Sequence, residues 1–207
     1  MLEFSKRTGL PSGLQKDITR YISNNSFNED IIPESMIEIL EEMPMSIKGD
    51  IAKQAFEEII ANIKFFQEKE DRFLWAFLPK MKQMNFFAGE YLFTQREQAE
   101  EVYFIFKGKV KLMYDLTDGE TDIPYLIPFN MYVEGSYFGD SDVLADTSNE
   151  GRDGTALVDA KSTIYVIVGK DLIQVLKLFK HSYLKEMRII AKERRLHHKA
   201  AIDELKM

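Results

Sequence analysis

The stretch FFAGEYLFTQREQAEEVYFIFKGKVKLM, residues 86–113, decides the fold. It holds short runs rich in β-branched and aromatic residues, which are typical of strands. Ala88-Gly89 and Lys107-Gly108 separate these runs and carry the glycines that turns favour. The runs are Tyr91–Phe93, Val102–Phe106 and Val110–Tyr114, the last ending just beyond the stretch. The pattern therefore predicts short strands joined by turns.

The same pattern continues along the chain to Val168. Asp118-Gly119 is a further turn signal, and three more runs resemble strands: Tyr125–Ile127, Ala156–Val158 and Ile164–Val168. Many short strands at near-regular spacing indicate a sandwich or a barrel, here from about residue 84 to residue 168.

The residues up to about Phe66 predict a string of short helices. Pro11 suits a first helical turn, and Leu14, Ile18 and Tyr21 follow it at helical spacing. Pro33 begins a second predicted helix. Ser46 is the expected cap of a longer third helix. One apolar face of that third helix is predicted to hold Ile47, Ile51, Ala55, Ile59 and Ile63.

Helices are also expected on either side of the strands. Phe73–Leu78 predicts a helix just before them, and Leu172, Val175, Leu176 and Phe179 form a helical face after them. A second C-terminal helix is expected from Ser182 to Lys206. The predicted order is therefore helices, β-barrel, helices.

Composition excludes several classes of protein. The chain has 207 residues, a net charge of −7 and no cysteine. It can form no disulfide, and no apolar run approaches the roughly 18 residues of a membrane helix. We expect a reducing, cytosolic setting. The acidic balance also argues against nucleic acid as a partner, because phosphate backbones are bound by clustered lysine and arginine.

Enzyme signatures are scarce, so neither a catalytic site nor a metal site is predicted. The histidines, His181, His197 and His198, lie on the predicted C-terminal helices, without partners at metal or triad spacing. His197 and His198 are read as surface residues. Phosphate loops of the Walker or dinucleotide type are missing. One carboxylate pair, Asp118 and Asp122, belongs to a predicted turn, which leaves Asp140 and Asp142 for attention.

Those two aspartates lie in GSYFGDSDVL, residues 135–144, which we call the cassette. Gly139 can adopt a positive φ and gather backbone N–H groups on one side, as an anion site requires, and a short helix starting at Ser141 would add its dipole. Asp140 can accept a hydrogen bond from a ribose hydroxyl. From the residues alone, a simple glycine-hinged turn between strands is the better explanation of the segment.

Several motifs together resemble a known family. The stretch FFAGEYLFTQREQAEEVYFIFKGKVKLM, the hexapeptide GSYFGD and TALVDAKSTIYVI (residues 155–167) are similar, in this order, to motifs of the cyclic-nucleotide-binding domain. LPSGLQKDITRYI (residues 10–22) resembles the linker helix of cyclic-nucleotide-modulated cation channels, whose C-linker precedes that domain. The resemblance implies a helical C-linker at 1–66 and a binding domain at 67–207.

The resemblance also refines the expected fold class. It implies an α+β chain with an N-terminal α-helical linker, followed by an antiparallel β-roll of the double-stranded β-helix or jelly-roll type at about 84–168. C-terminal helices at 170–206 would close the roll.

By the same resemblance, the cassette binds a cyclic phosphate. Gly139 allows close backbone approach, Asp140 stands at the ribose-binding acidic position, and residues 141–144 form the short helix. This chain departs from the family at the clamping arginine, whose position holds Gly154; Arg152, two residues earlier after a longer loop, is the replacement we expect. The implied ligand-binding residues are Phe138, Gly139, Asp140, Ser141, Asp142, Arg152, Thr155, Ala156, Arg194 and Arg195.

Some of these residues have a plainer interpretation. Thr155 is either a ligand contact or a buried strand residue. Arg194 and Arg195 either close over the base or belong to a solvated basic face together with Lys192 and Lys199. Asp142 adds a negative charge where the phosphate would lie, so the departures are expected to weaken binding.

The resemblance implies a cytoplasmic gating module of a voltage-gated type of cation or potassium channel. Its ligand would be cyclic AMP or cyclic GMP, without any cofactor. Its partners would be the transmembrane pore of the parent channel and three further copies, assembled as a homotetramer through the linker. One alternative is a degenerate domain of the ether-à-go-go-like branch, whose pocket the chain fills itself. A remote alternative is a cyclic-AMP-dependent transcription regulator.

Overall fold

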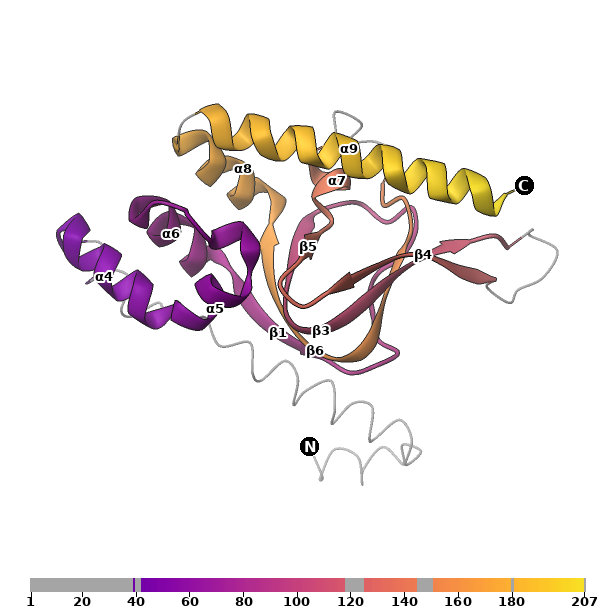
Figure 1. Ribbon diagram of the computed structural model, residues 1–207, viewed down its shortest axis with the longest axis horizontal. Coiled ribbons are helices and arrows are strands. Elements are labelled where there is room, and N and C mark those ends of the chain that lie inside the picture. The colour runs from indigo at the N-terminus through magenta and orange to yellow at the C-terminus, as the bar shows by residue number, and fades with distance from the viewer. Residues whose placement is uncertain (1–38, 40–41, 118–124, 145–150, 180, 207) are drawn as a thin grey trace, which may run out of the picture.

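The computed structural model describes residues 39, 42–117, 125–144, 151–179 and 181–206. The predicted helices that begin at Pro11 and Pro33, and the predicted Asp118-Gly119 turn, lie outside these residues. In the described part, no helix is long and apolar enough to cross a membrane. Figure 1 shows helices at both ends of the chain packed around a curved sheet.

The third predicted helix is divided into two, so its prediction as one element was wrong. Helix α4 (Met45–Ala55) begins before Ser46, directly after Pro44, and Phe56 separates it from α5 (Glu57–Asn62). Phe56 is 1% exposed whereas Ile47 is 45% exposed. The buried face follows Phe56 rather than Ile47, because the large aromatic ring gains more from burial.

The helical segment before the sheet continues with three short elements. The 3-10 helix η1 spans Lys64–Phe66, α6 spans Asp71–Phe77, and the 3-10 helix η2 spans Leu78–Lys80. Helix α6 confirms the helix expected near Phe73–Leu78.

The sheet is antiparallel and has six strands. It runs in the order β1-β6-β3-β4, while β2 also pairs with β6 and β5 pairs with β3. Figure 1 shows β3 and β6 curving side by side through the roll. The strands are β1 (Lys82–Phe86), β2 (Tyr91–Phe93), β3 (Glu101–Asp115), β4 (Leu126–Val133), β5 (Tyr137–Phe138) and β6 (Thr155–Val168).

Lys107-Gly108 is not a turn, contrary to the prediction. Strand β3 passes through it without a break, and the register with β6 shifts on both sides of Lys107. Gly108 has φ +105°, and a Cβ atom there would collide with Ser162 of β6. The glycine therefore serves a β-bulge, which needs the same backbone freedom as a turn. The two runs expected at 156–158 and 164–168 likewise form one strand, β6.

Strand β3 contributes to two separate cores, because successive side chains on a strand point to opposite faces. Phe104 and Phe106 pack in the helix-side core, whereas Tyr103 and Ile105 pack in the roll core. The helix-side core includes Ala52, Phe56, Ile63, Phe66, Phe73, Phe77, Phe104, Leu172 and Met187. The roll core is Phe93, Tyr103, Ile105, Val110, Leu112, Tyr132, Phe138, Ala156, Val158, Ile164 and Val166.

Two helices close the chain, as predicted. Helix α8 spans Gly169–Leu178 and α9 spans His181–Leu205. Figure 1 shows α9 lying across the open side of the roll, above the short helix α7 (Asp140–Val143). The fold class is therefore confirmed: a roll-like antiparallel sheet with helices at both ends.

Candidate functional site

The cassette turns at Gly139. This residue has φ +84° and is the N-cap of α7, which begins at Asp140, one residue before the predicted start. A Cβ atom at Gly139 would lie 2.9 Å from an Arg152 guanidinium nitrogen and 3.0 Å from the Glu101 carbonyl oxygen. Only glycine fits here without displacement, since both the backbone angle and the space exclude a side chain. The turn thus brings backbone, cassette and arginine together.

Arg152 reaches the cassette from its loop. Its side chain is 2% exposed. One guanidinium nitrogen donates to the Gly139 carbonyl at 3.2 Å and lies 3.4 Å from the Asp142 carboxylate, while the other donates to the Glu101 carbonyl at 2.8 Å. The guanidinium also lies 4.2 Å above the Phe93 ring centroid. Its Nε has no hydrogen-bond partner among the residues that the structure describes. A buried cation is therefore fixed beside α7.

Gly154, where the resemblance led us to expect an arginine, has no room for a side chain. A Cβ atom there would lie 2.7 Å from the Phe129 ring and 2.8 Å from the Met113 carbonyl oxygen. An arginine at position 154 would require the backbone to move. Arg152 is the arginine that approaches the cassette instead.

Thr155 and Ala156 follow at the start of β6, and both are buried. Thr155 is buried, and its hydroxyl accepts a hydrogen bond from the Gln95 backbone N–H at 3.0 Å. Ala156 is fully buried in the roll core, as is Phe138 of β5. In this structure, the Thr155 hydroxyl holds the β2–β3 loop.

Asp140 is paired with an arginine from the helix above it. Its side chain is 0% exposed, and Arg194 of α9 donates to its Oδ1. Within the described part of the chain, its Oδ2 has no hydrogen-bond partner. Burial raises the pKa of this carboxyl, and the nearby Arg194 charge opposes that rise. The Arg194 guanidinium also lies 4.6 Å above the Tyr137 ring centroid. Arg194 thus ties α9 to the cassette.

A second carboxylate of the cassette, Asp142, lies beside Arg152. Burial raises the pKa of Asp142 to about 6, although the Arg152 charge acts in the opposite direction. Ser141 is buried and donates weakly to Asp142 at 3.4 Å. Arg195 of α9 lies 3.4 Å from Asp153, next to Arg152 in the chain. Both arginines of the predicted lid therefore face the roll rather than solvent.

His198 is not a surface residue, contrary to the prediction. It is 4% exposed, and its Nε2 lies 3.0 Å from the Tyr132 hydroxyl and 3.1 Å from the Asn130 side-chain nitrogen. Burial lowers its pKa to about 4, and the nearby Arg194 charge acts in the same direction. Its exposed neighbour His197 does point elsewhere. The signal that sequence reasoning missed is one buried face of α9: Met187, Ala191, Arg195, His198 and Ile202.

A cavity of about 310 Å³ adjoins Arg152 beneath the C-terminal half of α9. This volume is at the lower end of small-molecule sites. Basic side chains outnumber acidic ones along its wall. The lining residues are Gln95, Arg96, Tyr114, Arg152 and Asp153 from the roll, and Lys199, Ile202, Asp203 and Lys206 from α9. Among the described residues, no group of three or more acidic, histidine or cysteine side chains is placed to hold a metal.

Comparisons with known proteins identify similar sequences. Residues 83–179 match the family model for the cyclic nucleotide-binding domain. The chain is 25% identical to cyclic nucleotide-gated channel alpha-3 of Homo sapiens over 178 residues, which is 84% of this chain and 24% of that protein. It is 28% identical over 142 residues to a cone photoreceptor channel subunit alpha of Gallus gallus, covering 67% of this chain and 18% of that subunit.

A plant relative is also similar: cyclic nucleotide-gated ion channel 2 of Arabidopsis thaliana, 24% identical over 135 residues, which is 65% of this chain and 18% of that protein. The chain thus spans a quarter or less of the length of these relatives. Its residues 83–179 are therefore similar to cyclic nucleotide-binding domains, and the longer alignments are to cyclic nucleotide-gated channels.

Proposed function

We propose that this chain is the cytoplasmic regulatory module of a cation channel, binding cyclic AMP or cyclic GMP in the roll and coupling that binding to the pore. The observation that carries the proposal is Arg152. Its guanidinium is buried against the cassette backbone and borders a cavity. A fixed, charged donor beside a glycine turn suits a cyclic phosphate, because charge-assisted hydrogen bonds are the strongest that a side chain offers.

The proposal assigns the neighbouring residues by position. The phosphate would contact Arg152 and the backbone of the turn at Gly139, and Asp140 would accept a ribose hydroxyl. Asp140 is now held by Arg194. Nucleotide binding would therefore redistribute the contacts of Asp140 and shift the position of α9. A ligand changes a conformational equilibrium only through its different affinities for the two states, and this contact supplies such a difference.

The finer assignment belongs to the same proposal. Residues 1–66 would be the C-linker and 67–207 the binding domain, in a homotetrameric channel of the voltage-gated, potassium-type branch. Apolar side chains on the described part of the linker support an assembly surface, since Ile39, Met45 and Ile47 are 60%, 39% and 45% exposed. We expect a partner chain to cover these side chains.

A second candidate function is a regulatory domain that binds no nucleotide, as in the ether-à-go-go-like branch. One observation favours it: both cassette carboxylates already have arginine partners from this chain, and α9 covers them. The ionised Asp142 would also repel a phosphate. In that case α9 itself occupies the place of the ligand.

Calorimetric titration with cyclic AMP and cyclic GMP separates the two candidates. We expect saturable binding that weakens at least about 10-fold in Arg152→Gln, the loss of one charged hydrogen bond. Arg188→Gln, at an exposed arginine of α9, is the matched control and should bind as the wild type does. Circular dichroism checks that both variants are folded.

Arg194→Gln gives the second arm. If α9 competes for Asp140, this variant should bind nucleotide more tightly than the wild type. Absence of heat at about millimolar nucleotide in the wild type and in Arg194→Gln would instead support the domain without a ligand.

A further inference from the structure

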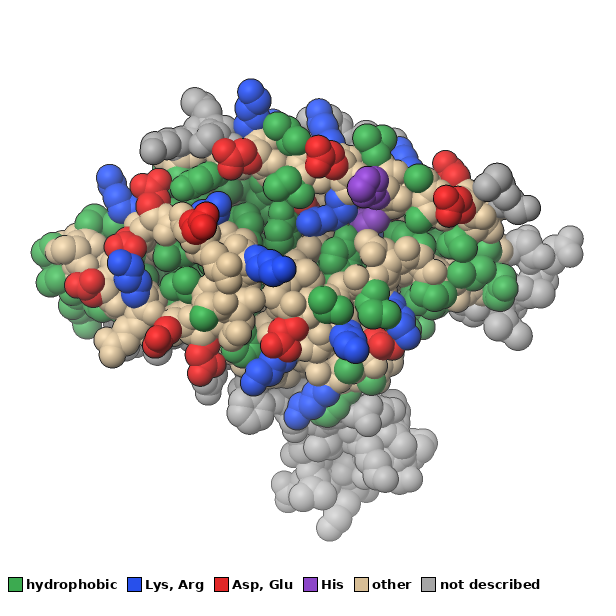
Figure 2. All heavy atoms as spheres, viewed as in Figure 1, with side chains coloured by type: hydrophobic (Ala, Val, Ile, Leu, Met, Phe, Trp, Pro, Cys, Tyr) green, Lys and Arg blue, Asp and Glu red, His purple; other side chains and the backbone are tan. Residues whose placement is uncertain are grey.

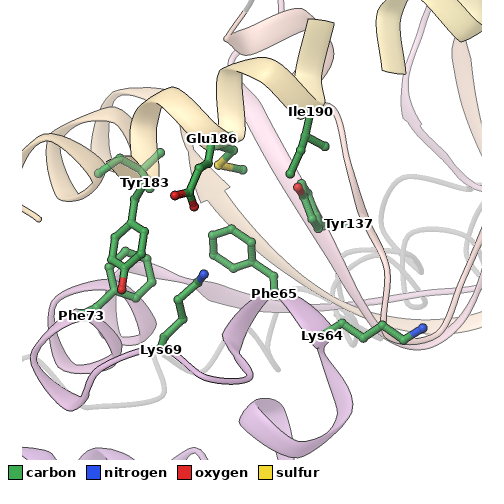
Figure 3. A pocket seen from close by; sticks show the side chains of 10 residues that line it. Lys64, Phe65, Lys69, Phe73, Tyr137, Tyr183, Glu186 and Ile190 are labelled. Carbon is green, nitrogen blue, oxygen red and sulfur yellow. The ribbon is translucent and has the colours of Figure 1, made fainter. Parts of the chain in front are cut away.

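A second cavity lies between the N-terminal helices and α9, on the other side of the cassette from the cavity beside Arg152. Its volume is about 290 Å³. Figure 3 shows Phe65 and Tyr137 facing it from one side and Ile190 from α9 above, with Tyr183 and Phe73 at the far end. Figure 2 shows hydrophobic side chains gathered beneath α9, bordered by charged ones. This cavity, which we call the linker pocket, shares no lining residue with the cavity beside Arg152.

The walls of the linker pocket are mainly aromatic. Phe65 packs edge-on to Tyr137, with ring centroids 5.3 Å apart, and Phe73 packs against Tyr183 at 5.1 Å. Leu176 of α8 and Met187 of α9 complete the apolar lining. A small ligand with one or two flat rings matches such walls, because aromatic surfaces stack or meet edge-to-face.

One cation, that of Lys69, points into the linker pocket. Lys64 and the Glu186 carboxylate also line the pocket, and Glu70 lies close to Tyr183. The Lys69 ammonium lies 4.8 Å from the Tyr183 ring centroid and 5.6 Å from that of Phe65. Figure 3 shows this ammonium pointing into the pocket, whereas Lys64 points away. No carboxylate of the described residues forms an ion pair with Lys69. A cation held by rings alone retains unused hydrogen-bond donors.

We propose that the linker pocket is a second binding site, for a small aromatic monocarboxylate whose ring lies among Phe65, Tyr137 and Tyr183 and whose carboxylate binds Lys69. The occupant contacts η1, α6, β5, α8 and α9 at once. The Arg194 guanidinium, which pairs with the Asp140 carboxylate, also lies over the Tyr137 ring. A ligand here therefore stabilises α9 in its position over the roll.

The test uses the whole chain without any cyclic nucleotide, so its outcome is independent of the nucleotide site. Indole-3-acetate is the probe, and tryptophol, the same ring system with a hydroxyl group, is its uncharged counterpart. Calorimetry should show saturable binding of indole-3-acetate that is about 10-fold tighter than that of tryptophol. Methyl resonances of Met187 and Ile190 should shift with the same affinity.

Two variants test the assignment. Lys69→Met should weaken indole-3-acetate about 10-fold without changing tryptophol. Lys185→Met removes the same charge from an exposed position of α9 outside the pocket, and should have no effect. Ile190→Trp should block both probes; because Ile190 is 43% exposed, the larger side chain leaves the fold intact. No saturable binding up to about 10 mM, or equal affinity in Lys69→Met and wild type, would overturn the proposal.

Discussion

The two cores of this molecule are built differently, although β3 contributes to both. The helix-side core consists of hydrophobic residues and contains a chain of contacting phenylalanines, including Phe66, Phe77 and Phe104. The roll core meets buried polar groups where α9 covers it. Those groups include Asp140, Arg152, Arg195 and His198. Burying charges contributes little to stability. The comparison indicates that the helix-side core supplies most of the stability, whereas the side of the roll beneath α9, with its buried charges, supplies less.

The largest effect is expected in the helix-side core. Phe66→Ala should lower the free energy of unfolding by about 3–5 kcal/mol, because a fully buried ring is replaced by a cavity. Phe66 is 0% exposed and stacks on Phe104 with ring centroids 5.3 Å apart. Urea unfolding monitored by circular dichroism gives the value.

Leu178→Ala is the control for that substitution. Leu178 is 70% exposed, so its truncation should change the free energy of unfolding by less than about 0.5 kcal/mol. Equal losses in the two variants would show that the phenylalanine cluster is not the main source of stability.

The next effect concerns the contact between α9 and the cassette. Arg194→Gln leaves the Asp140 carboxyl buried without its cation and should cost about 3 kcal/mol. Asp140→Asn should relieve much of this loss in the double variant, since a neutral amide needs no counter-charge. A double-mutant cycle by urea unfolding should give a coupling energy of about 1–3 kcal/mol. A coupling energy near zero would contradict a tie between α9 and the cassette.

A smaller loss is expected where the roll lacks space. Gly154→Ala should cost about 1–3 kcal/mol, because the added methyl group meets the Phe129 ring and the Met113 carbonyl. Thermal unfolding followed by circular dichroism measures it. An unchanged melting temperature would mean that β4, which carries Phe129, can shift to make room for the methyl group. Position 154 would then not exclude an arginine.

The sequence predicted the positions of the helices and strands better than it predicted their lengths. Runs of β-branched and aromatic residues, separated by turn residues, correctly predicted strands near Tyr91 and Val110, because those signals are local. They misread Gly108, since a bulge and a turn both require a positive φ and only the partner strand, with Ser162, distinguishes them. The division of the third helix also depends on burial of Phe56, which is a tertiary effect.

The site was predictable to a similar extent. Arg152 was the arginine expected at the cassette, and its guanidinium does contact the Gly139 carbonyl. The crowding of Gly154 by Phe129 joins residues of different strands, which no local pattern reveals. His198 was missed because the buried face of α9 carries polar residues at two of its five positions, so it has no apolar signature.

The smallest expected effect is the pH dependence of the wild type, because two buried groups of the roll oppose each other. His198 has its folded-state pKa lowered to about 4, so the stability tied to its neutral form is lost as pH falls below the unfolded value of about 6.5. Asp142 has its folded-state pKa raised to about 6, so its protonation favours the folded state as pH falls toward 4. Between pH 7 and pH 5, His198 should lower the free energy of unfolding by about 2 kcal/mol, and Asp142 should raise it by about 1 kcal/mol.

Single variants should separate the two contributions. In His198→Gln the loss disappears, and this variant should gain stability relative to wild type as pH falls from 7 to 5. In Asp142→Asn the gain disappears, and the loss should become steeper than in wild type. Urea unfolding at both pH values measures each change, and other titrating groups cancel when variants are compared.

Because Asn130 and Tyr132 contact the same imidazole nitrogen, a third variant, Asn130→Ala, should raise the His198 pKa toward its ordinary value by admitting water. Identical pH dependence in wild type and His198→Gln would mean that α9 opens before the imidazole is protonated.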